Sequence, residues 1–258
     1  LVSVAKASQL KVNQFEKKII NKIIIEIKKK ILSKSINFQL SKLAVDETKF
    51  GKLNDKIIKN FYKTSSLVKE LLKQKLYAPI KDSKKDIYEI YKPIGVICGV
   101  TPSTNPIATP LNYILNSIKS RNSIIICPNP RAYNTCLMLI DNIRIVLKRY
   151  RFPINLINIA PRELLRSEMI INLFNLCDRN IVTGNKNFIS KVQKSNKPYL
   201  IFGVGNPPIV IDKNVDFKEV AKSVMVSKSF DYSTSCSSDS VLIIDQKIYK
   251  DFLKELLK

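Results

Sequence analysis

The sequence predicts an α/β protein: a parallel, doubly wound, Rossmann-like sheet preceded by a helical N-terminal segment. From Gly95 onward, short apolar runs alternate with stretches of helical periodicity, which is typical of strand–helix–strand units on a parallel sheet. Before Gly95, apolar residues recur at three- and four-residue spacing between lysines, as in long amphipathic helices. With 258 residues, 45% of them hydrophobic and 25% charged, the chain can bury a sizeable core in one large or two smaller domains.

The elements are expected in the following order. Helices over residues 4–45 and 52–76 lead to a polar break at 81–85 and an edge strand at 87–91. Strands at 95–100, 123–127, 155–159 and 181–182 alternate with helices at 107–120, 131–149, 162–176 and 186–194. A strand at 241–244 and a helix at 247–257 end the chain.

A further helix is predicted after Asp216, which forms a capping box with Glu219. One face of this helix is expected to carry Phe217, Val220, Ala221, Val224 and Met225. The helix leads the chain toward Cys236.

The glycine-rich fingerprint GxGxxG of dinucleotide-binding turns is absent. Gly203-Val204-Gly205 comes closest, but Pro208 stands where the third glycine would be, and no helical pattern opens there. The pattern therefore supports a doubly wound fold without establishing a dinucleotide site.

The net charge of +23 is high enough to attract nucleic acid, anionic membranes or polyphosphate ligands. However, the lysines are scattered along the whole chain and form no cluster interleaved with aromatic residues. We interpret the charge as a general compositional bias and expect neither a nucleic-acid nor a membrane partner.

Five dispersed cysteines form no CxxC pair, and the chain has no histidine. Metal sites that need histidine are therefore excluded, a thiolate zinc site is not expected, and we predict no metal site. Free thiols suit a reducing cytosol, no apolar run is long enough to cross a bilayer, and no secretory signal is present, so a cytoplasmic location is expected.

Cys236 is the candidate nucleophile. It follows the helix predicted after Asp216 and lies among serines and threonines, with no bulky apolar neighbour in the sequence. A thiol at such a junction can face a cleft, where its thiolate can attack a carbonyl group. The alternative interpretation is that Cys236 is a small buried hydrophobic residue, as free cysteines commonly are.

Three ordered blocks resemble the CoA-acylating aldehyde dehydrogenases, including the aldehyde half of the bifunctional aldehyde–alcohol dehydrogenases. The blocks are residues 43–60 (LAVDETKFGKLNDKIIKN), 91–106 (YKPIGVICGVTPSTNP) and 222–241 around Cys236. The run Cys-Ser-Ser-Asp at 236–239 is similar to that of acylating enzymes for small functionalised aldehydes such as sulfoacetaldehyde. The resemblance implies a Rossmann-like NAD(P)-binding domain with its helical N-terminus over 1–206, and the beginning of a second, catalytic α/β domain over 207–258.

The resemblance also implies roles for individual residues. Cys236 would be the nucleophile, and the amide of Asn105, with the backbone N–H of Cys236, would stabilise the oxyanion. The cofactor NAD or NADP would lie against Thr101, Pro102, Ser103, Thr104, Pro128, Thr183, Gly184 and Gly203. From the residues alone, Asn105 is more readily interpreted as a turn residue that caps the next helix, and the two roles do not exclude each other.

Three segments depart from the family pattern. Relatives carry Thr-Gly-Gly-Pro-Gly where this chain has Thr183, Gly184, Asn185, Lys186 and Asn187, so larger side chains would approach the cofactor phosphates and Lys186 would compensate by charge. Asn129 stands where many relatives have histidine. Arg131 is either a phosphate contact or a solvated helix start. Tyr232 is bulky where asparagine is usual, which affects the geometry expected at the nucleophile.

Gly203 occupies the position of the glutamate that activates water in hydrolytic aldehyde dehydrogenases. Without a positioned general base, water is a poor acceptor for the acyl group, whereas the thiolate of CoA is a strong nucleophile. The resemblance therefore implies an oxidoreductase that converts a small aldehyde, CoA and NAD(P)⁺ to acyl-CoA and NAD(P)H.

Two further expectations concern the extent of the chain. Family members continue well beyond the nucleophile and are expected to form homo-oligomers, so we expect the isolated chain to be a fragment with little dehydrogenase activity. The alternative function is that of a non-catalytic degraded fragment or a basic nucleotide-binding remnant, which the early end of the chain and the lost glycines would explain.

Overall fold

Four helices open the chain in the computed structural model, which describes residues 1–258 except 83, 166, 185–188 and 191. They are α1 (Val2–Val12), α2 (Lys17–Ile31), α3 (Lys34–Thr48) and α4 (Leu53–Lys73). The sequence of α2 shows why it forms, since its isoleucines recur every three or four residues and five of them are fully buried. The helical N-terminal segment predicted from the sequence is confirmed.

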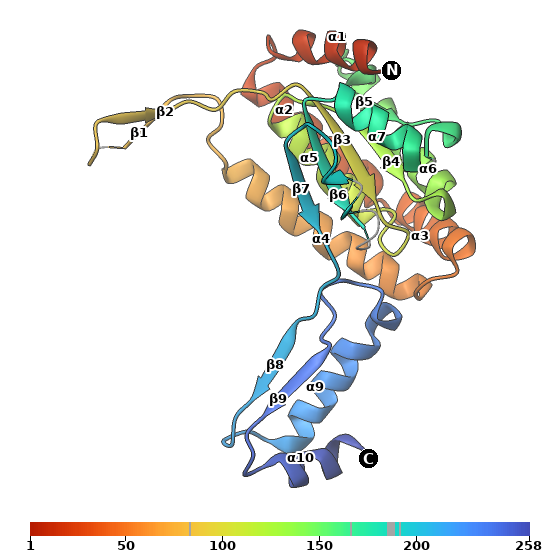
Figure 1. Ribbon diagram of the computed structural model, residues 1–258, viewed down its shortest axis with the longest axis vertical. Coiled ribbons are helices and arrows are strands. Elements are labelled where there is room, and N and C mark those ends of the chain that lie inside the picture. Colours follow the sequence, from red (N-terminus) through yellow and green to blue (C-terminus); the bar gives the residue numbers. More distant parts are fainter. Residues whose placement is uncertain (83, 166, 185–188, 191) are drawn as a thin grey trace.

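The central sheet has five parallel strands in the order β5-β4-β3-β6-β7 (Figure 1). The strands are β3 (Val96–Thr101), β4 (Ser123–Pro128), β5 (Ile157–Ile159), β6 (Arg179–Thr183) and β7 (Tyr199–Phe202). The connecting helices are α5 (Ala108–Lys119), α6 (Tyr133–Arg149) and α7 (Ser167–Leu176), with short 3₁₀ turns η1 (Pro130–Ala132), η2 (Ile154–Leu156) and η3 (Arg162–Leu165). The predicted alternation of strands and helices is confirmed through α7, whereas the helix predicted at 186–194 falls mostly on residues outside those described.

Both faces of the sheet are covered by helices. In β3, Val96 and Cys98 pack in a core with α1 and α7, while the intervening Ile97 packs in the larger core with α2, α4, α5 and α6. Every residue of β3 and β4 is buried, as expected for central strands of a doubly wound sheet. This burial fixes the carboxyl ends of the strands, which in Figure 1 point toward the C-terminal part of the chain.

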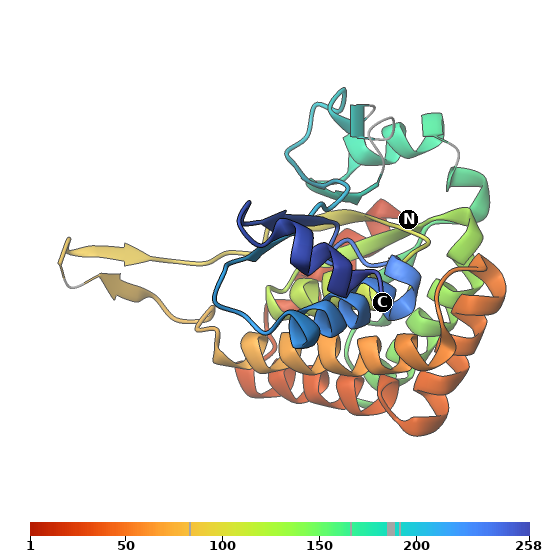
Figure 2. The same cartoon turned by 90° about the horizontal axis from the view of Figure 1, so that it is seen from below.

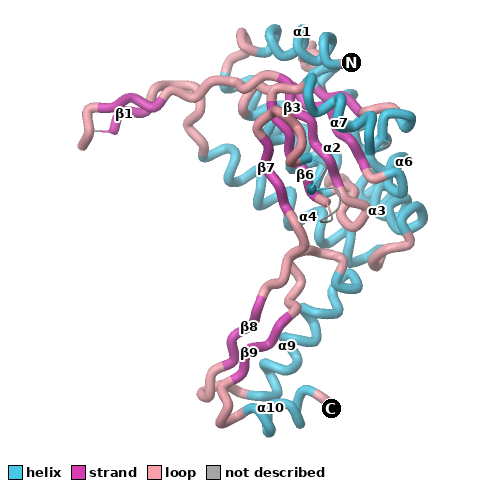
Figure 3. The backbone as a smooth tube through the Cα atoms, in the orientation of Figure 1, coloured by secondary structure: helices cyan, strands magenta, loops and turns pink. Residues whose placement is uncertain are grey.

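The C-terminal part forms a smaller α/β unit beside the end of the sheet (Figures 1 and 3). It contains β8 (Pro208–Ile211), α9 (Phe217–Ser229), the 3₁₀ turn η4 (Phe230–Ser233), β9 (Val241–Ile244) and α10 (Tyr249–Leu256). Strands β8 and β9 pair in parallel, and Ile211, Ala221 and Phe252 form a small core of their own. The side chain of Asp216 accepts hydrogen bonds from the backbone N–H groups of Lys218 and Glu219, so the predicted N-cap of α9 is confirmed.

Two sequence expectations were wrong in detail. Met225 was placed on the same face of α9, but it is 64% exposed, because the small C-terminal core takes Phe217, Val220 and Ala221 of this helix and does not extend to Met225. The polar break at 81–85 contributes to a strand: β1 (Ile80–Asp82) pairs antiparallel with β2 (Ile87–Glu89). This hairpin projects from the body as an arm, which Figure 2 shows most clearly.

Candidate active site

A cavity of about 690 Å³ lies at the carboxyl ends of the central strands. This is the edge at which open α/β sheets bind ligands. Its lining includes all eight residues predicted to contact the cofactor, namely Thr101, Pro102, Ser103, Thr104, Pro128, Thr183, Gly184 and Gly203. Cys236 lines the same cavity from the loop that follows α9. Pocket size and position both suit a nucleotide cofactor.

A second cavity, of about 310 Å³, shares a wall with the first. It is lined by Asn105, Lys63 and Thr64, and also by Thr183, Gly203 and Cys236, which border the first cavity as well. The structure therefore brings the predicted nucleophile and the predicted oxyanion donor to one cavity. Cys236 stands at the junction of the two spaces.

Asn105 is only 7% exposed, and its side-chain oxygen has no hydrogen-bond partner among the described residues. The following helix begins at Ala108 with Ile107 as its N-cap and without a capping side chain. The alternative role of Asn105 as a helix cap is therefore wrong. A buried amide with an unpaired atom at a cavity wall is a group that a ligand can satisfy.

Cys236 is exposed, whereas the other four cysteines, all within the described part of the chain, are buried. Burial raises the pKa of Cys136 to about 12. The pKa of Cys98 is raised by hydrogen bonding to Cys127 and Cys177 and by burial. Since the thiolate is the reactive form, Cys236 is the thiol best placed for nucleophilic chemistry. The interpretation of Cys236 as a buried hydrophobic residue is wrong.

Tyr113 closes one side of the second cavity. Its hydroxyl forms a 2.6 Å hydrogen bond with the hydroxyl of Thr183, and its pKa is raised by burial and by the nearby Cys236. Thr183 ends β6, so the Tyr113 hydroxyl connects α5 to the carboxyl end of the sheet beside Cys236.

Gly205 permits the closest approach at the site. An alanine Cβ at this position would overlap the carbonyl oxygen of Cys236 and lie 2.8 Å from its carbonyl carbon. At Gly203, by contrast, the nearest atom to an added Cβ would be Ile189 Cδ1 at 3.8 Å. Within the described residues, neither cavity is lined by an aspartate or glutamate, so position 203 leaves no carboxylate to activate water.

A buried ion cluster lies beneath the loop that carries Cys236. The carboxylate of Asp231, which is fully buried, forms ion pairs with Lys56 and Lys59 of α4. The same carboxylate accepts hydrogen bonds from the backbone N–H of Lys52 (2.8 Å) and the hydroxyl of Thr234 (2.6 Å). Burial alone would raise the pKa of Asp231, but the hydrogen bonds from Lys59 and Thr234 and the lysine charges outweigh it and lower the pKa.

Sequence reasoning missed this cluster. The only signal for it is that Lys56 and Lys59 occupy the buried face of α4, which also carries Asn60, Val68 and Leu71. A lysine on the buried stripe of an amphipathic helix needs a partner, although the pattern does not say which carboxylate supplies it.

The cluster predicts a pH dependence of stability. Burial lowers the pKa of Lys59 to about 8, even though the hydrogen bond to Asp231 opposes the shift. Between about pH 8 and 10.5 the unfolded chain then binds more protons than the folded chain, so stability rises with pH in this window, by up to about 3 kcal/mol. We expect urea unfolding to show this rise for the native chain and a smaller one for Lys59→Met. Parallel pH profiles of the two proteins would contradict the prediction.

Other sequence-predicted contacts are less favoured. Arg131 is exposed and is not among the residues that line the first cavity, as expected for a solvated helix start. Asn129 does line that cavity, and its side chain accepts a hydrogen bond from the N–H of Arg131 at the start of η1. Asn185, Lys186 and Asn187 lie outside the described residues.

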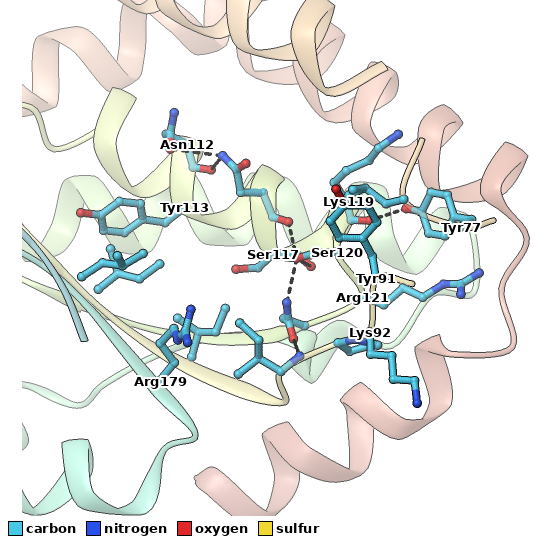
Figure 4. A pocket seen from close by; sticks show the side chains of 18 of the residues that line it. Tyr77, Tyr91, Lys92, Asn112, Tyr113, Ser117, Lys119, Ser120, Arg121 and Arg179 are labelled. Atoms are coloured by element: carbon cyan, nitrogen blue, oxygen red, sulfur yellow. Dashed lines mark hydrogen bonds between the residues drawn. The ribbon is translucent and has the colours of Figure 1, made fainter. Parts of the chain in front are cut away.

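A further cavity, of about 490 Å³, lies on the flank of the sheet and adjoins the second one (Figure 4). Its lining includes Tyr77, Tyr91, Tyr113, Arg121 and Arg179, but none of the five cysteines. Arg121 stacks over the ring of Tyr77 and donates to the carbonyl of Phe15, so it is engaged in holding the N-terminal helices to the sheet.

Within the described ranges, no helix has both the length and the apolar character that crossing a bilayer requires. The same residues contain no group of three or more histidine, cysteine, aspartate or glutamate side chains that could hold a metal ion.

An exposed cysteine between two cavities, at the carboxyl edge of a doubly wound sheet, is the arrangement that the sequence resemblance implied. The model of the aldehyde dehydrogenase family matches residues 22–258, and the chain belongs to this family. The relatives that it matches are acylating members, with the aldehyde half of the bifunctional enzymes among them.

Sulfoacetaldehyde dehydrogenase (acylating) from Cupriavidus necator is 34% identical over 227 residues, which make up 88% of this chain and 46% of that protein. The bifunctional aldehyde-alcohol dehydrogenase of Escherichia coli is 32% identical over 213 residues, 81% of this chain and 24% of that protein. The crystal structure of an acetylating aldehyde dehydrogenase from Geobacillus thermoglucosidasius superposes with a TM-score of 0.89 at 27% identity, covering 99% of this chain and 56% of that chain. The chain thus spans about half the length of the sulfoacetaldehyde and acetylating enzymes.

Proposed function

We propose that this chain carries the nucleophile and the cofactor cleft of an NAD(P)-dependent, CoA-acylating aldehyde dehydrogenase. The observation that carries the proposal is the position of Cys236, exposed at the junction of two cavities, with Asn105 on the wall of one and no carboxylate on the described walls of either. The acylating relatives and the NAD(P)- and CoA-dependent chemistry of such enzymes support it.

The residues fit the chemistry in the following way. The Cys236 thiolate attacks the aldehyde carbon, and the amide of Asn105 and the backbone N–H of Cys236 stabilise the oxyanion. When bound, NAD(P)⁺ in the cavity lined by Thr101–Thr104, Pro128, Thr183, Gly184 and Gly203 would supply the hydride acceptor. The resulting Cys236 thioester is then attacked by the thiolate of CoA, which forms acyl-CoA and frees the cysteine.

The absence of a carboxylate at position 203 supports transfer to CoA rather than to water. CoA thiolate needs no general base in the cleft, whereas water does. Among the described residues, a Cβ added at Gly203 would meet Ile189 Cδ1 at 3.8 Å, and position 203 carries no carboxylate.

We further propose the division into a cofactor-binding domain over 1–206 and the beginning of a catalytic domain over 207–258. For the whole protein we propose a small aldehyde and CoA as substrates and a homo-oligomeric state. Five free thiols fit a reducing compartment such as the cytosol.

Transfer of an acetyl group from acetyl-CoA to Cys236 tests the proposed function. The cysteine thiolate attacks the thioester carbonyl, a new S–C bond forms, and CoA thiolate leaves. We expect peptide mass spectrometry to find one acetyl group on Cys236, with an equal amount of CoA released. Cys236→Ser should show none, and Asn105→Ala should react about 10²–10³-fold more slowly because one oxyanion donor is lost.

Iodoacetamide provides the control, because alkylation of the thiolate needs no oxyanion donor. If iodoacetamide modifies Cys236 but acetyl-CoA does not, the proposed role of Cys236 as the acyl acceptor of this chain is wrong. Equal acetylation rates for the native chain and Asn105→Ala would remove Asn105 from the site.

A further inference from the structure

The loop before Cys236 has an unusual backbone. Asp231, Tyr232 and Ser233 all have positive φ angles (49°, 51° and 56°), a left-handed conformation that residues other than glycine rarely adopt. Three such residues in succession persist only where surrounding contacts fix them. Here those contacts converge on Asp231, whose backbone N–H also donates to the carboxylate of Asp55 on α4 (2.8 Å).

Lys56 contacts more than this loop. Its ammonium group lies 3.3 Å from the Asp231 carboxylate and donates to the backbone carbonyl of Thr104 at 3.5 Å. Thr104 directly precedes Asn105, and Asp231 is five residues before Cys236. One buried ammonium group, on a side chain only 2% exposed, therefore joins the segment of the oxyanion donor to the segment of the nucleophile.

We propose that Lys56 is a positioning residue that sets the separation of Cys236 and Asn105 by bridging Asp231 and Thr104. The inference rests on the proposed roles of those two residues in the acylation chemistry. Lys56 itself does not touch the reacting atoms in this assignment. It acts through the two loops that it connects.

The packing around the bridge supports its precision. Gly51 has a φ of +79°, and a Cβ there would overlap Asp231 Oδ1 and lie 2.6 Å from the Lys56 ammonium nitrogen. The turn before α4 therefore closes over the bridge. Further along α4, the ammonium group of Lys63 donates to the hydroxyl of Ser235, the residue before Cys236, at 3.2 Å.

The bridge matters because oxyanion stabilisation depends on geometry. A donor must lie about 2.7–3.1 Å from the position of the oxyanion. A displacement of about 1 Å between reacting groups can lower a rate about 100-fold. A contact that joins Thr104 to Asp231, and so holds the segments of Asn105 and Cys236 together, is where such precision would be set.

Lys59 provides a matched control. It is also a buried lysine of α4 and also forms an ion pair with Asp231, but its hydrogen bonds in the described structure go to Asp231 and not to Thr104. If the lysines serve only to neutralise Asp231, then Lys56→Met and Lys59→Met should behave alike. If Lys56 is a bridge, the two variants should differ.

The experiment compares two reactions of Cys236 in the 258-residue chain. With 4-nitrophenyl acetate, the thiolate attacks the ester carbonyl, an S–C bond forms and 4-nitrophenolate leaves, so the reaction depends on the oxyanion donors. With iodoacetamide, the thiolate displaces iodide at a saturated carbon and no oxyanion forms. Both reactions depend on the accessibility of the thiol, so the ratio of the acylation rate to the alkylation rate removes that contribution. The ratio therefore reports the position of Cys236 relative to Asn105.

We expect Lys56→Met to lower the ratio of acylation to alkylation 10- to 100-fold, and Lys59→Met to leave it within about threefold of the native value. Lys56→Gln keeps one donor for Asp231 but is too short to reach both loops, so we expect the same loss. Counting reactive thiols checks the fold, because the native chain exposes one cysteine and an unfolded chain exposes five.

Each outcome decides between explanations. An equal loss in Lys56→Met and Lys59→Met, or a native ratio in Lys56→Gln with a single reactive thiol, overturns the bridge. If Asn105→Ala lowers the ratio and Lys56→Met does not, only the bridge fails. If Asn105→Ala leaves the ratio unchanged, the proposed oxyanion site itself is wrong. Because 4-nitrophenyl acetate contains no CoA, this result does not depend on CoA binding.

Discussion

Replacing Gly205 with alanine is expected to displace the loop of Cys236 and to lower acylation of that residue by 4-nitrophenyl acetate by about 100-fold. The new Cβ would occupy the space of the Cys236 carbonyl group; the Cβ is fixed to its Cα and the carbonyl is backbone, so neither can rotate away. The chain must shift at the junction of the two cavities. Overpacking of this kind typically also costs about 1–3 kcal/mol of folding free energy. Stopped-flow release of 4-nitrophenolate and urea unfolding measure the two effects.

Gly203→Ala is the control for this substitution. It adds the same methyl group two residues earlier in the same loop, where the nearest atom of the described residues is a flexible isoleucine methyl at 3.8 Å. We expect native acylation and a change in unfolding free energy within about 0.5 kcal/mol. If Gly205→Ala and Gly203→Ala react at the same rate, the close approach of Gly205 to Cys236 has no role in positioning the nucleophile.

The parts of the site that follow strands could be predicted from the sequence. Residues 101–104 and 183–184 come directly after buried apolar runs, and parallel strands bring their carboxyl ends to one edge. Cys236 could be singled out because its neighbours are small and polar. These inferences depend on local periodicity and on a general rule of sheet topology, and both are visible in a single sequence.

The contacts that hold the loops could not be predicted in this way. Asp231 meets Lys56 and Lys59 across 175 and 172 residues of sequence, and no local pattern pairs them. Gly205 was interpreted only as part of a failed nucleotide fingerprint, although its lack of a side chain is required by Cys236. Such contacts depend on the relative placement of the central sheet and the C-terminal unit, which periodicity does not determine.

Tyr232 illustrates how a departure from a family pattern is resolved by geometry. From the sequence, a bulky residue where asparagine is usual was expected to affect the geometry at Cys236. In the structure the ring is 65% exposed, and the ammonium group of Lys52 lies 4.7 Å from its centroid. Asn and Asp adopt positive φ more readily than tyrosine does. The turn at 231–233 therefore depends more on the contacts of the adjacent Asp231.

Replacing Asp231 with alanine is expected to be strongly destabilising, by about 3–5 kcal/mol, because it leaves Lys56 and Lys59 buried without a counter-charge. Urea unfolding followed by circular dichroism at pH 7 measures the loss. The destabilisation should be smaller when the substitution is made in a Lys59→Met background, because one of the two uncompensated charges is then absent.

Glu70→Ala removes a carboxylate from an ion pair on the same helix, but there Glu70 and Lys73 are 63% and 62% exposed. Exposed pairs contribute at most about 1 kcal/mol, so this variant should unfold close to the native chain. If Asp231→Ala cost no more than Glu70→Ala, the Asp231 cluster would not be what fixes the loop that carries Cys236. The same result would leave the left-handed turn at 231–233 without a physical cause, since no other carboxylate in the described structure joins that turn to both lysines.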